Sequence, residues 1–219
     1  MGSMERKGTS RMKILVIGAT GPTGREIVKQ ALERGHQVTA VARRPETAGF
    51  PADVRVIKAD VMDAASLATA AEHQHAVISS LGSKIDRNPT TLFSQGTRNI
   101  VAAMQFSGIR RFLCITGIGA GDSKGHGGFL YDRIIQPLLL DEIYKDKTRQ
   151  EEIVRQSGLD WTIFRPGALN NGPLKGVCRE FIDLTGVTIG GISRADTAHC
   201  LLAHLECPTS YGKTITYCY

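Results

Sequence analysis

A glycine-rich turn between a short apolar run and an amphipathic stretch is the feature that most constrains this chain. The apolar run, Lys13–Ile17, is typical of a strand buried on both faces of a parallel sheet. The turn Gly18-Ala19-Thr20-Gly21-Pro22-Thr23-Gly24 follows it, and 25–34 then places its apolar residues on one helical face. Small residues there let backbone N–H groups reach a pyrophosphate at a helix N-terminus, where the missing N–H of Pro22 costs nothing. The turn therefore predicts a dinucleotide site, and the alternative is an ordinary glycine-rich turn.

Strand-like and helix-like stretches alternate along the rest of the chain. Further strands are predicted over 37–41, 54–57, 75–79, 111–115, 161–164 and 214–217. Helices are predicted from an N-cap at Asp63 through Ala71, over 91–106, up to Gln156, and over 195–205. The alternation predicts an α/β fold: a Rossmann doubly wound parallel sheet with helices on both faces. After Arg165 the pattern loosens, which predicts a small C-terminal segment on the substrate side.

Size and charge exclude several classes of protein. The 219 residues, of which 42% are hydrophobic, suit one globular domain over 12–219, and 1–11 is interpreted as a disordered leader or a cloning remnant. No apolar run approaches the roughly 18 residues of a membrane span. The formal charge is +6, of which the leader supplies +2 through Arg6, Lys7 and Arg11 against Glu5, so nucleic-acid binding is not indicated. We expect a cytoplasmic monomer or homodimer that binds a small molecule and neither nucleic acid nor membrane.

The five cysteines, Cys114, Cys178, Cys200, Cys207 and Cys218, form no CxxC pair and are odd in number. This pattern favours free buried thiols in a reducing compartment over a disulfide or a metal site. No metal is therefore expected.

The residues that follow each predicted strand are candidates for cofactor contacts. Arg43 and Arg44 follow the second strand, where arginine can pair with the 2′-phosphate of NADP and a carboxylate would bind the ribose of NAD. They favour NADPH with NAD as the alternative, unless they are simply a solvated pair. Asp60, with Val61 beside it, follows the third strand and could accept a hydrogen bond from the adenine or cap a helix.

The fourth strand is followed by Ser80, Leu81 and Gly82. In a doubly wound sheet this backbone passes beneath the ribose and nicotinamide of a bound cofactor.

These residues together resemble the atypical, or extended-like, short-chain dehydrogenase/reductase superfamily, and within it the NAD(P)H-binding and NmrA-like proteins. Beyond the glycine turn, the similarity rests on Asp60, on Ser157–Gly167 and on Ile192–Asp196. It implies places in the cofactor site for Pro166 and Gly167. The stretches 88–91 and 96–104 look especially like NADPH-dependent flavin and biliverdin reductases.

The catalytic positions depart from that pattern. Active members use Ser, Tyr and Lys, with Tyr four residues before Lys so that the ammonium lowers the pKa of the tyrosine. Lys147 fits the lysine position, but Ile143 stands four residues earlier and Tyr144 three. Thr116 alone can supply a hydroxyl at the serine position. The candidate catalytic residues are thus Lys147, Tyr144 and Thr116, and Lys147 is also expected to hold the nicotinamide ribose unless it is a surface lysine.

We predict an NADPH-dependent oxidoreductase that reduces a small flat or carbonyl acceptor, such as a flavin or quinone. Such acceptors need no strong protein acid. The first alternative is a non-catalytic NmrA-like NADP-binding sensor that regulates a protein partner, which the incomplete triad favours. The second is an NAD(P)-dependent epimerase or dehydratase. The loop 117–128 lies where a substrate lid is expected, and its His126 is interpreted as a solvated residue.

Overall fold

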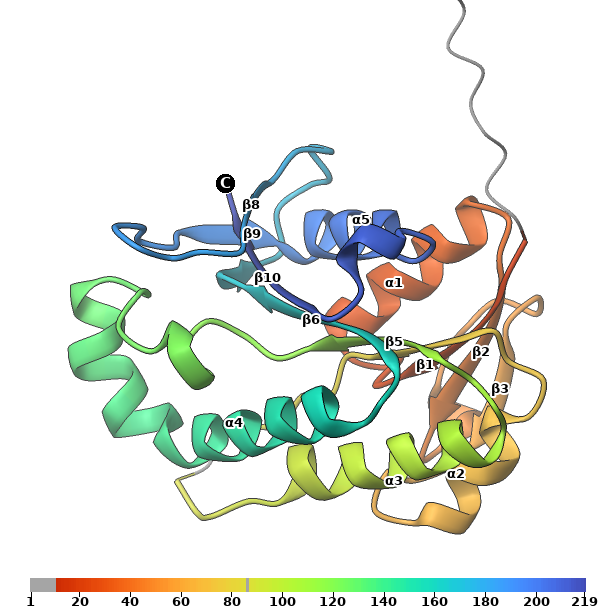
Figure 1. Cartoon of the computed structure of the whole chain (residues 1–219). Coiled ribbons are helices and arrows are strands. Elements are labelled where there is room, and N and C mark those ends of the chain that lie inside the picture. Colours follow the sequence, from red (N-terminus) through yellow and green to blue (C-terminus); the bar gives the residue numbers. More distant parts are fainter. Residues whose placement is uncertain (1–10, 86) are drawn as a thin grey trace, which may run out of the picture.

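The computed structural model describes residues 11–85 and 87–219, so the leader predicted over 1–11 lies outside the described residues except for Arg11. Strands and helices alternate as predicted (Figure 1). The strands are β1 (Lys13–Ile17), β2 (Gln37–Ala42), β3 (Arg55–Lys58), β4 (Ala76–Ser79), β5 (Arg111–Ile115), β6 (Asp160–Pro166), β7 (Ala168–Asn170), β8 (Arg179–Phe181), β9 (Gly191–Ser193) and β10 (Lys213–Cys218).

The helices are α1 (Pro22–Glu33), α2 (Ala64–Ala71), α3 (Leu92–Phe106), α4 (Asp141–Gln156) and α5 (Arg194–Ala203). A π-helical segment, Tyr131–Leu140, runs directly into α4 and was not predicted. The N-cap of α2 is Asp63 as predicted, since its carboxylate accepts from the backbone N–H of Ala65 at 3.1 Å. Within 11–85 and 87–219, no helix is both long and apolar enough to cross a bilayer.

The main sheet has the order β3-β2-β1-β4-β5-β6-β10-β8 and is parallel except for β8, which pairs antiparallel with β10. This order confirms the predicted doubly wound fold. The chain builds outward from β1 to β3 and then returns to place β4 on the other side of β1. The carboxyl ends of β1 and β4 therefore border the crevice where such sheets bind their ligands.

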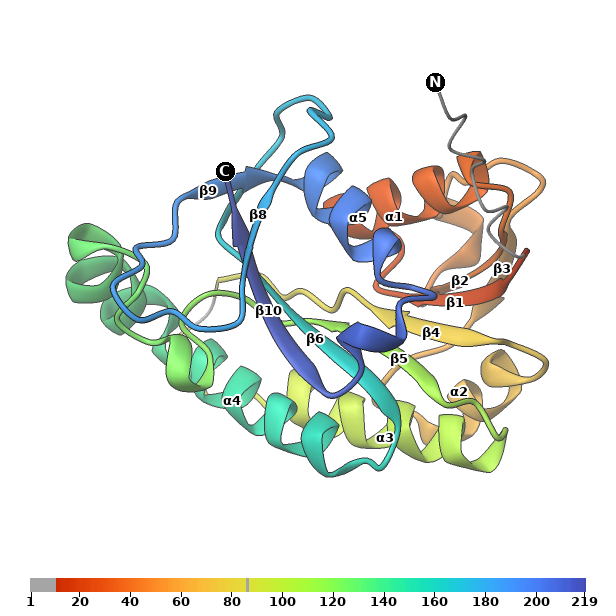
Figure 2. The same ribbon diagram turned by 45° about the horizontal axis from the view of Figure 1, so that its top comes forward.

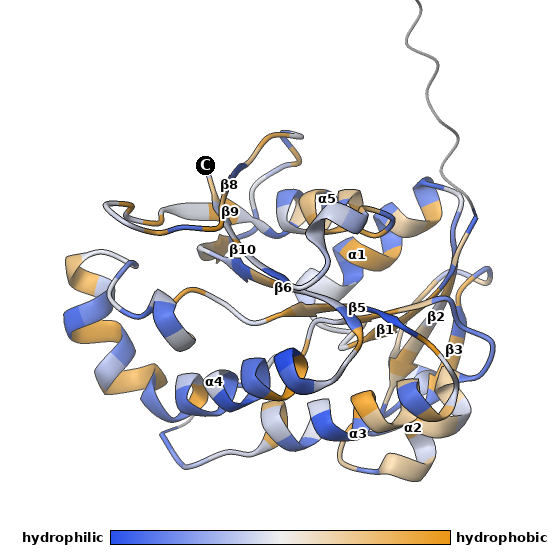
Figure 3. Cartoon of the chain, in the orientation of Figure 1, coloured by the Kyte–Doolittle hydropathy of each residue, from blue (hydrophilic) through white to orange (hydrophobic). Residues whose placement is uncertain are grey.

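Helices cover both faces of the sheet, with α1 and α5 on one face and α2, α3 and α4 on the other (Figures 1 and 2). Alternate residues of β1 enter the two resulting cores: Ile14 and Val16 pack on the α1 and α5 side, and Leu15 and Ile17 on the other. Burial on both faces is why the β1 sequence is continuously apolar. Hydrophobic residues accordingly gather on the strands, and hydrophilic ones cover much of α4 (Figure 3).

The chain after β6 forms the predicted small C-terminal segment. Here β7 and β9 make a separate parallel pair, with Asn170 opposite Ser193, while β8 adds an edge to the main sheet. These three short strands were not predicted, because each is defined by a partner far away in the sequence rather than by a local pattern.

The cysteines correct one expectation. Cys178 and Cys200 form a disulfide, whereas Cys114, Cys207 and Cys218 are free. The disulfide joins the loop before β8 to α5. These two positions, 22 residues apart, meet only because the loop before β8 packs on α5, so their spacing in the sequence did not predict the bond.

Candidate functional site

A cavity of about 620 Å³ opens at the carboxyl ends of β1 to β5, where the strand order reverses. All the predicted site residues line it except Gly24, Arg44, Pro166 and Gly167. Its lining is Ile17, Gly18, Thr20, Gly21, Pro22, Thr23, Val41, Ala42, Arg43, Ala59, Asp60, Val61, Ser80, Leu81, Gly82, Ser83, Lys84, Ile85, Leu92, Phe93, Ile115, Thr116, Leu140, Ile143, Tyr144, Lys147, Leu169 and Arg194.

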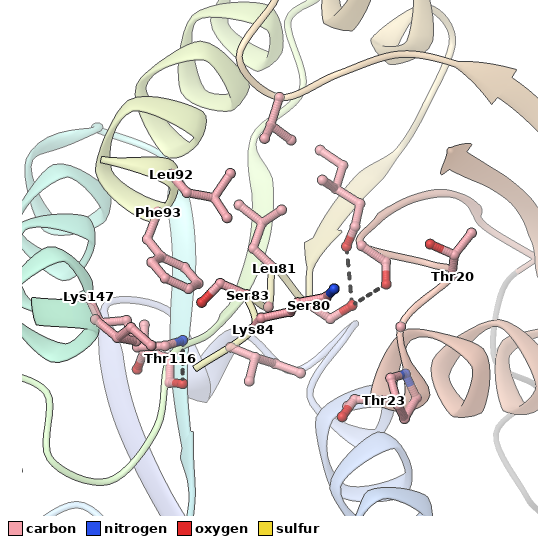
Figure 4. Close-up of a pocket in the computed structure, with 18 of the residues that line it drawn as sticks. Thr20, Thr23, Ser80, Leu81, Ser83, Lys84, Leu92, Phe93, Thr116 and Lys147 are labelled. Atoms are coloured by element: carbon pink, nitrogen blue, oxygen red, sulfur yellow. Dashed lines mark hydrogen bonds between the residues drawn. The ribbon is translucent and has the colours of Figure 1, made fainter. Parts of the chain in front are cut away.

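At its start, the glycine turn packs against the end of β4. Gly18 has a φ of +76°, and a Cβ there would lie 2.5 Å from the carbonyl oxygen of Ser80. The Ser80 hydroxyl donates to the carbonyl oxygens of Ile17 at 3.1 Å and Gly18 at 3.3 Å (Figure 4). Glycine is therefore required at position 18 for both conformation and space.

The other two glycines of the turn have different roles. Gly21 is the N-cap of α1 with an ordinary φ of −72°, and it lines the cavity. Gly24 does not line the cavity, because it faces the turn itself, where a Cβ would lie 2.2 Å from the Gly18 carbonyl oxygen. The expectation of a direct cofactor contact by Gly24 is thus replaced by close packing of helix on turn.

The two arginines after β2 differ in their position relative to the cavity. Arg43 lines the cavity, whereas the Arg44 side chain is exposed outside it and the Arg44 carbonyl accepts from Thr47 at 3.2 Å. Asp60 lines the cavity and accepts from the backbone N–H of Met62 at 3.0 Å. Val61 beside it also lines the cavity.

Lys147 reaches the cavity from α4. Its ammonium donates to the carbonyl oxygen of Thr116 at 2.8 Å and lies 4.3 Å from the ring centroid of Phe93 (Figure 4). Burial lowers the pKa of Lys147 to about 8, although Cys114, Glu151 and Asp146 oppose this shift. The side chain is only 8% exposed, which excludes the alternative of a surface lysine.

The hydroxyl of Thr116 is engaged away from the position that a triad serine would serve. It donates to Glu151 Oε1 at 2.7 Å. The same carboxylate accepts from Arg165 Nε at 2.8 Å and from Arg155 at 3.0 Å, and both Glu151 and Arg165 are buried. What Thr116 offers to Lys147 is its backbone carbonyl.

Tyr144 lines the cavity but is not activated by Lys147. Its hydroxyl accepts from the hydroxyl of Tyr131 at 2.9 Å. Burial raises the pKa of Tyr144, against a small opposing effect of that hydrogen bond, and burial likewise raises the pKa of Tyr131. The two phenols therefore remain protonated at neutral pH and are weak acids.

Pro166 and Gly167 lie outside the cavity lining, contrary to the expectation for them. Pro166 ends β6 and its carbonyl accepts from the backbone N–H of Ile118 at 3.2 Å. Gly167 packs so closely on Gly190 that any Cβ would overlap the Gly190 carbonyl oxygen. Pro166 thus contacts the loop after β5, and Gly167 lets the backbone at Gly190 pack closely on the end of β6.

Comparison with known proteins accounts for this architecture. A family model described as NAD(P)H-binding matches residues 18–208. The chain belongs to this NAD(P)H-binding family. The matched range starts at the first glycine of the turn and extends past α5, so it covers nearly the whole cavity lining.

Two relatives of this NAD(P)H-binding chain illustrate the family. It is 31% identical over 173 residues to an uncharacterized chloroplastic protein of Arabidopsis thaliana, which covers 75% of this chain and 61% of that protein. It is 29% identical over 205 residues to the uncharacterized sugar epimerase YhfK of Bacillus subtilis, which covers 89% of this chain and 88% of that one. The chain thus spans less than two thirds of the Arabidopsis relative.

Solved structures share the fold. The oxidoreductase YlbE of Lactococcus lactis has a TM-score of 0.81 at 22% identity, covering 94% of this chain and 90% of that one. The anaerobillin reductase ChuY of Escherichia coli O157:H7 has a TM-score of 0.78 at 23% identity, covering 94% of this chain and 96% of that one. A short-chain dehydrogenase/reductase of Veillonella parvula in complex with NADP has a TM-score of 0.80 at 18% identity, covering 95% of this chain and 94% of that one. The family match confirms the predicted NAD(P)H-binding family, and these structures show the same fold.

The sequence prediction missed part of the cavity lining. Phe93, Leu140, Leu169 and Arg194 come from α3, the π-helical segment, β7 and α5. Only Arg194 lay in a stretch noticed for its resemblance, Ile192–Asp196, and no role was given to it there. The others have no sequence signal, because their positions depend on how distant elements pack.

Proposed function

We propose that this protein is an NADPH-dependent reductase that transfers hydride to a flat conjugated acceptor such as a flavin or a quinone. The nicotinamide cofactor would supply the hydride, and the chain would bind and orient both partners. In this assignment the turn Gly18–Thr23 holds the diphosphate, Arg43 the 2′-phosphate and Lys147 the nicotinamide ribose. Leu140, Ile143 and Leu169, which also line the cavity, are apolar, which suits a flat acceptor.

The observation that carries the proposal is the uncoupling of Tyr144 from Lys147. A carbonyl reductase must protonate a developing alkoxide and uses an activated acid to do so. Here burial raises the pKa of Tyr144, while the Lys147 ammonium donates to Thr116 and the Thr116 hydroxyl donates to Glu151. A conjugated ring spreads the incoming charge and can take its proton from water, so it fits this site better than a carbonyl does.

The preference for NADPH is supported by the end of β2. The stretch Ala42-Arg43-Arg44-Pro45 contains no carboxylate to bind ribose hydroxyls, and Arg43 lines the cavity. The structural neighbour from Veillonella parvula was solved with NADP.

Oxidation of NADPH and NADH by the purified protein, with a flavin, a quinone and an aldehyde as acceptors, tests the proposal. We expect turnover with the flavin or the quinone and about tenfold or greater preference for NADPH. Tyr144→Phe should stay within a few-fold of wild type, and Lys147→Ala should weaken NADPH binding. Lys145→Ala is the matched control, since this exposed lysine of the same helix forms ion pairs with Asp141 and Glu142 and does not line the cavity.

Three outcomes would contradict the proposal. A loss of about 10²–10⁴-fold in Tyr144→Phe would show that Tyr144 is the acid of a conventional relay. Tight NADPH binding without turnover of any acceptor would favour the NmrA-like sensor with a protein partner. Interconversion of a sugar substrate without net NADPH oxidation would favour an epimerase, as the name of the YhfK relative suggests for that protein.

A further inference from the structure

The glycine turn offers a diphosphate fewer contacts than its length suggests. The N–H of Gly21 donates to the Gly18 carbonyl at 3.1 Å, and Pro22 has no N–H. The nearest cation on α1, Arg25, does not line the cavity: it donates to the Ala48 carbonyl at 2.8 Å and stacks 5.1 Å from the Phe50 ring centroid. The turn therefore presents only neutral groups to a ligand group that carries two negative charges.

Helix α5 brings a cation to the lining of the same cavity. It runs parallel to α1, because Gln30 donates to the Ala195 carbonyl at 2.8 Å and Arg34, four residues on, donates to the His199 carbonyl at 3.0 Å. The two helices lie side by side on one face of the sheet (Figures 1 and 2). Their N-termini thus point the same way, and side chains tilt toward a helix N-terminus. The first residue of α5, Arg194, accordingly lines the cavity together with the glycine turn.

The Arg194 side chain is held in place before any ligand arrives. Its Nη1 donates to Asn171 Oδ1 at 2.7 Å. The helix start is capped by Ser193, whose hydroxyl oxygen accepts from the Asp196 N–H at 2.9 Å. The nearby carboxylate of Asp196 accepts instead from the backbone N–H groups of Lys175 and Gly176. Arg194 thus has a neutral partner that orients it and keeps its charge available.

We infer that Arg194 binds the diphosphate of the nicotinamide cofactor, so that the C-terminal segment completes the cofactor site. The inference rests on the proposed use of this cavity by NADPH. The other cations in the lining occupy different elements: Arg43 follows β2, Lys84 lies in the turn after β4, and Lys147 is on α4. A guanidinium can bind phosphate oxygens in a bidentate manner, which the neutral turn cannot replace.

Calorimetric titration with three ligands separates this contact from the others. The ligands are NADPH, 2′-phospho-ADP-ribose, which lacks the nicotinamide, and adenosine 2′-phosphate, which lacks the diphosphate. Arg194→Gln should lower the affinity for NADPH and for 2′-phospho-ADP-ribose by about 10- to 100-fold. Its affinity for adenosine 2′-phosphate should stay within about twofold of wild type. The salt dependence of NADPH binding should also become shallower, because one ionic contact is lost. Arg98→Gln, an exposed arginine on α3, should change none of these affinities.

Unchanged NADPH affinity in Arg194→Gln would overturn the inference, and a rise in the KM for the acceptor alone would assign Arg194 to the acceptor instead. If wild type bound no NADPH, the proposed function itself would fail, and the inference with it. Should Arg194→Gln be unfolded by thermal melting, Asn171→Ala tests the same contact. It frees the guanidinium without removing it and should weaken NADPH and 2′-phospho-ADP-ribose equally, by a few-fold; no change would contradict the inference.

Discussion

At the scale of single residues, Gly21 separates ligand binding from folding. Its φ of −72° suits any residue, and an added Cβ would meet only the Gly18 carbonyl oxygen at 3.3 Å. We expect Gly21→Val to fold with stability close to wild type while its side chain occupies the cavity. NADPH should then no longer raise the melting temperature, which thermal melting with and without the cofactor measures.

Gly24 provides the contrast for that experiment. A Cβ at this position would overlap the Gly18 carbonyl, so Gly24→Ala should lower the free energy of unfolding by about 1–3 kcal/mol even without ligand. If Gly21→Val still gained stability from NADPH, the cofactor would bind elsewhere than in this cavity.

At the scale of elements, the N-terminus of α3 is capped jointly by its own sequence and by α4. The Thr90 hydroxyl accepts from the N–H of Leu92 at 3.2 Å. Thr91, the N-cap, makes no side-chain capping bond. Instead Asp146 Oδ2 accepts from the N–H of Phe93 at 2.8 Å and of Ser94 at 3.3 Å, in a fully buried position. This contact also holds the Phe93 ring near Lys147. The packing of α3 on α4 therefore also fixes one wall of the cavity, because Phe93 lines it.

Asp146→Ala should therefore lower the free energy of unfolding by about 1–3 kcal/mol, because it leaves buried N–H groups without their acceptor. Urea denaturation measures this change. Asp63→Ala removes the local cap of α2 on the surface and should cost only about 1 kcal/mol. An Asp146→Ala effect no larger than that of Asp63→Ala would show that the N-terminus of α3 is satisfied in another way.

At the scale of the whole molecule, the Cys178–Cys200 disulfide ties the loop before β8 to α5. Protein unfolded without reductant should expose three titratable thiols, those of Cys114, Cys207 and Cys218. Because the bridge restricts the unfolded chain, its reduction should lower the free energy of unfolding by about 3 kcal/mol. Cys207→Ser, which leaves the bridge intact, is the control. A count of five thiols would restore the free-thiol prediction.

Short-range patterns were sufficient for the main sheet apart from its edge strand β8, and for half of the residues that line the cavity. Three features depend only on residues close together in the chain: the strand Lys13–Ile17, the glycine turn and the Asp63 cap. Each could therefore be predicted from the sequence without a structure. Alternation of strands and helices then left few sheet orders to choose from, and this chain has the expected one. The turns at the carboxyl ends of β1 to β4 followed from that order.

The rest of the cavity, and the contacts that support it, were decided by tertiary packing alone. Arg194, Phe93 and Asp146 belong to helices whose contacts join residues far apart in the sequence, and Cys178 meets Cys200 in the same way. Tyr144 shows the same limit: its position on α4 was evident, but burial and its bond to Tyr131 set its chemistry. Burial and long-range contact depend on which surfaces of the folded elements meet, and no spacing within one element records that.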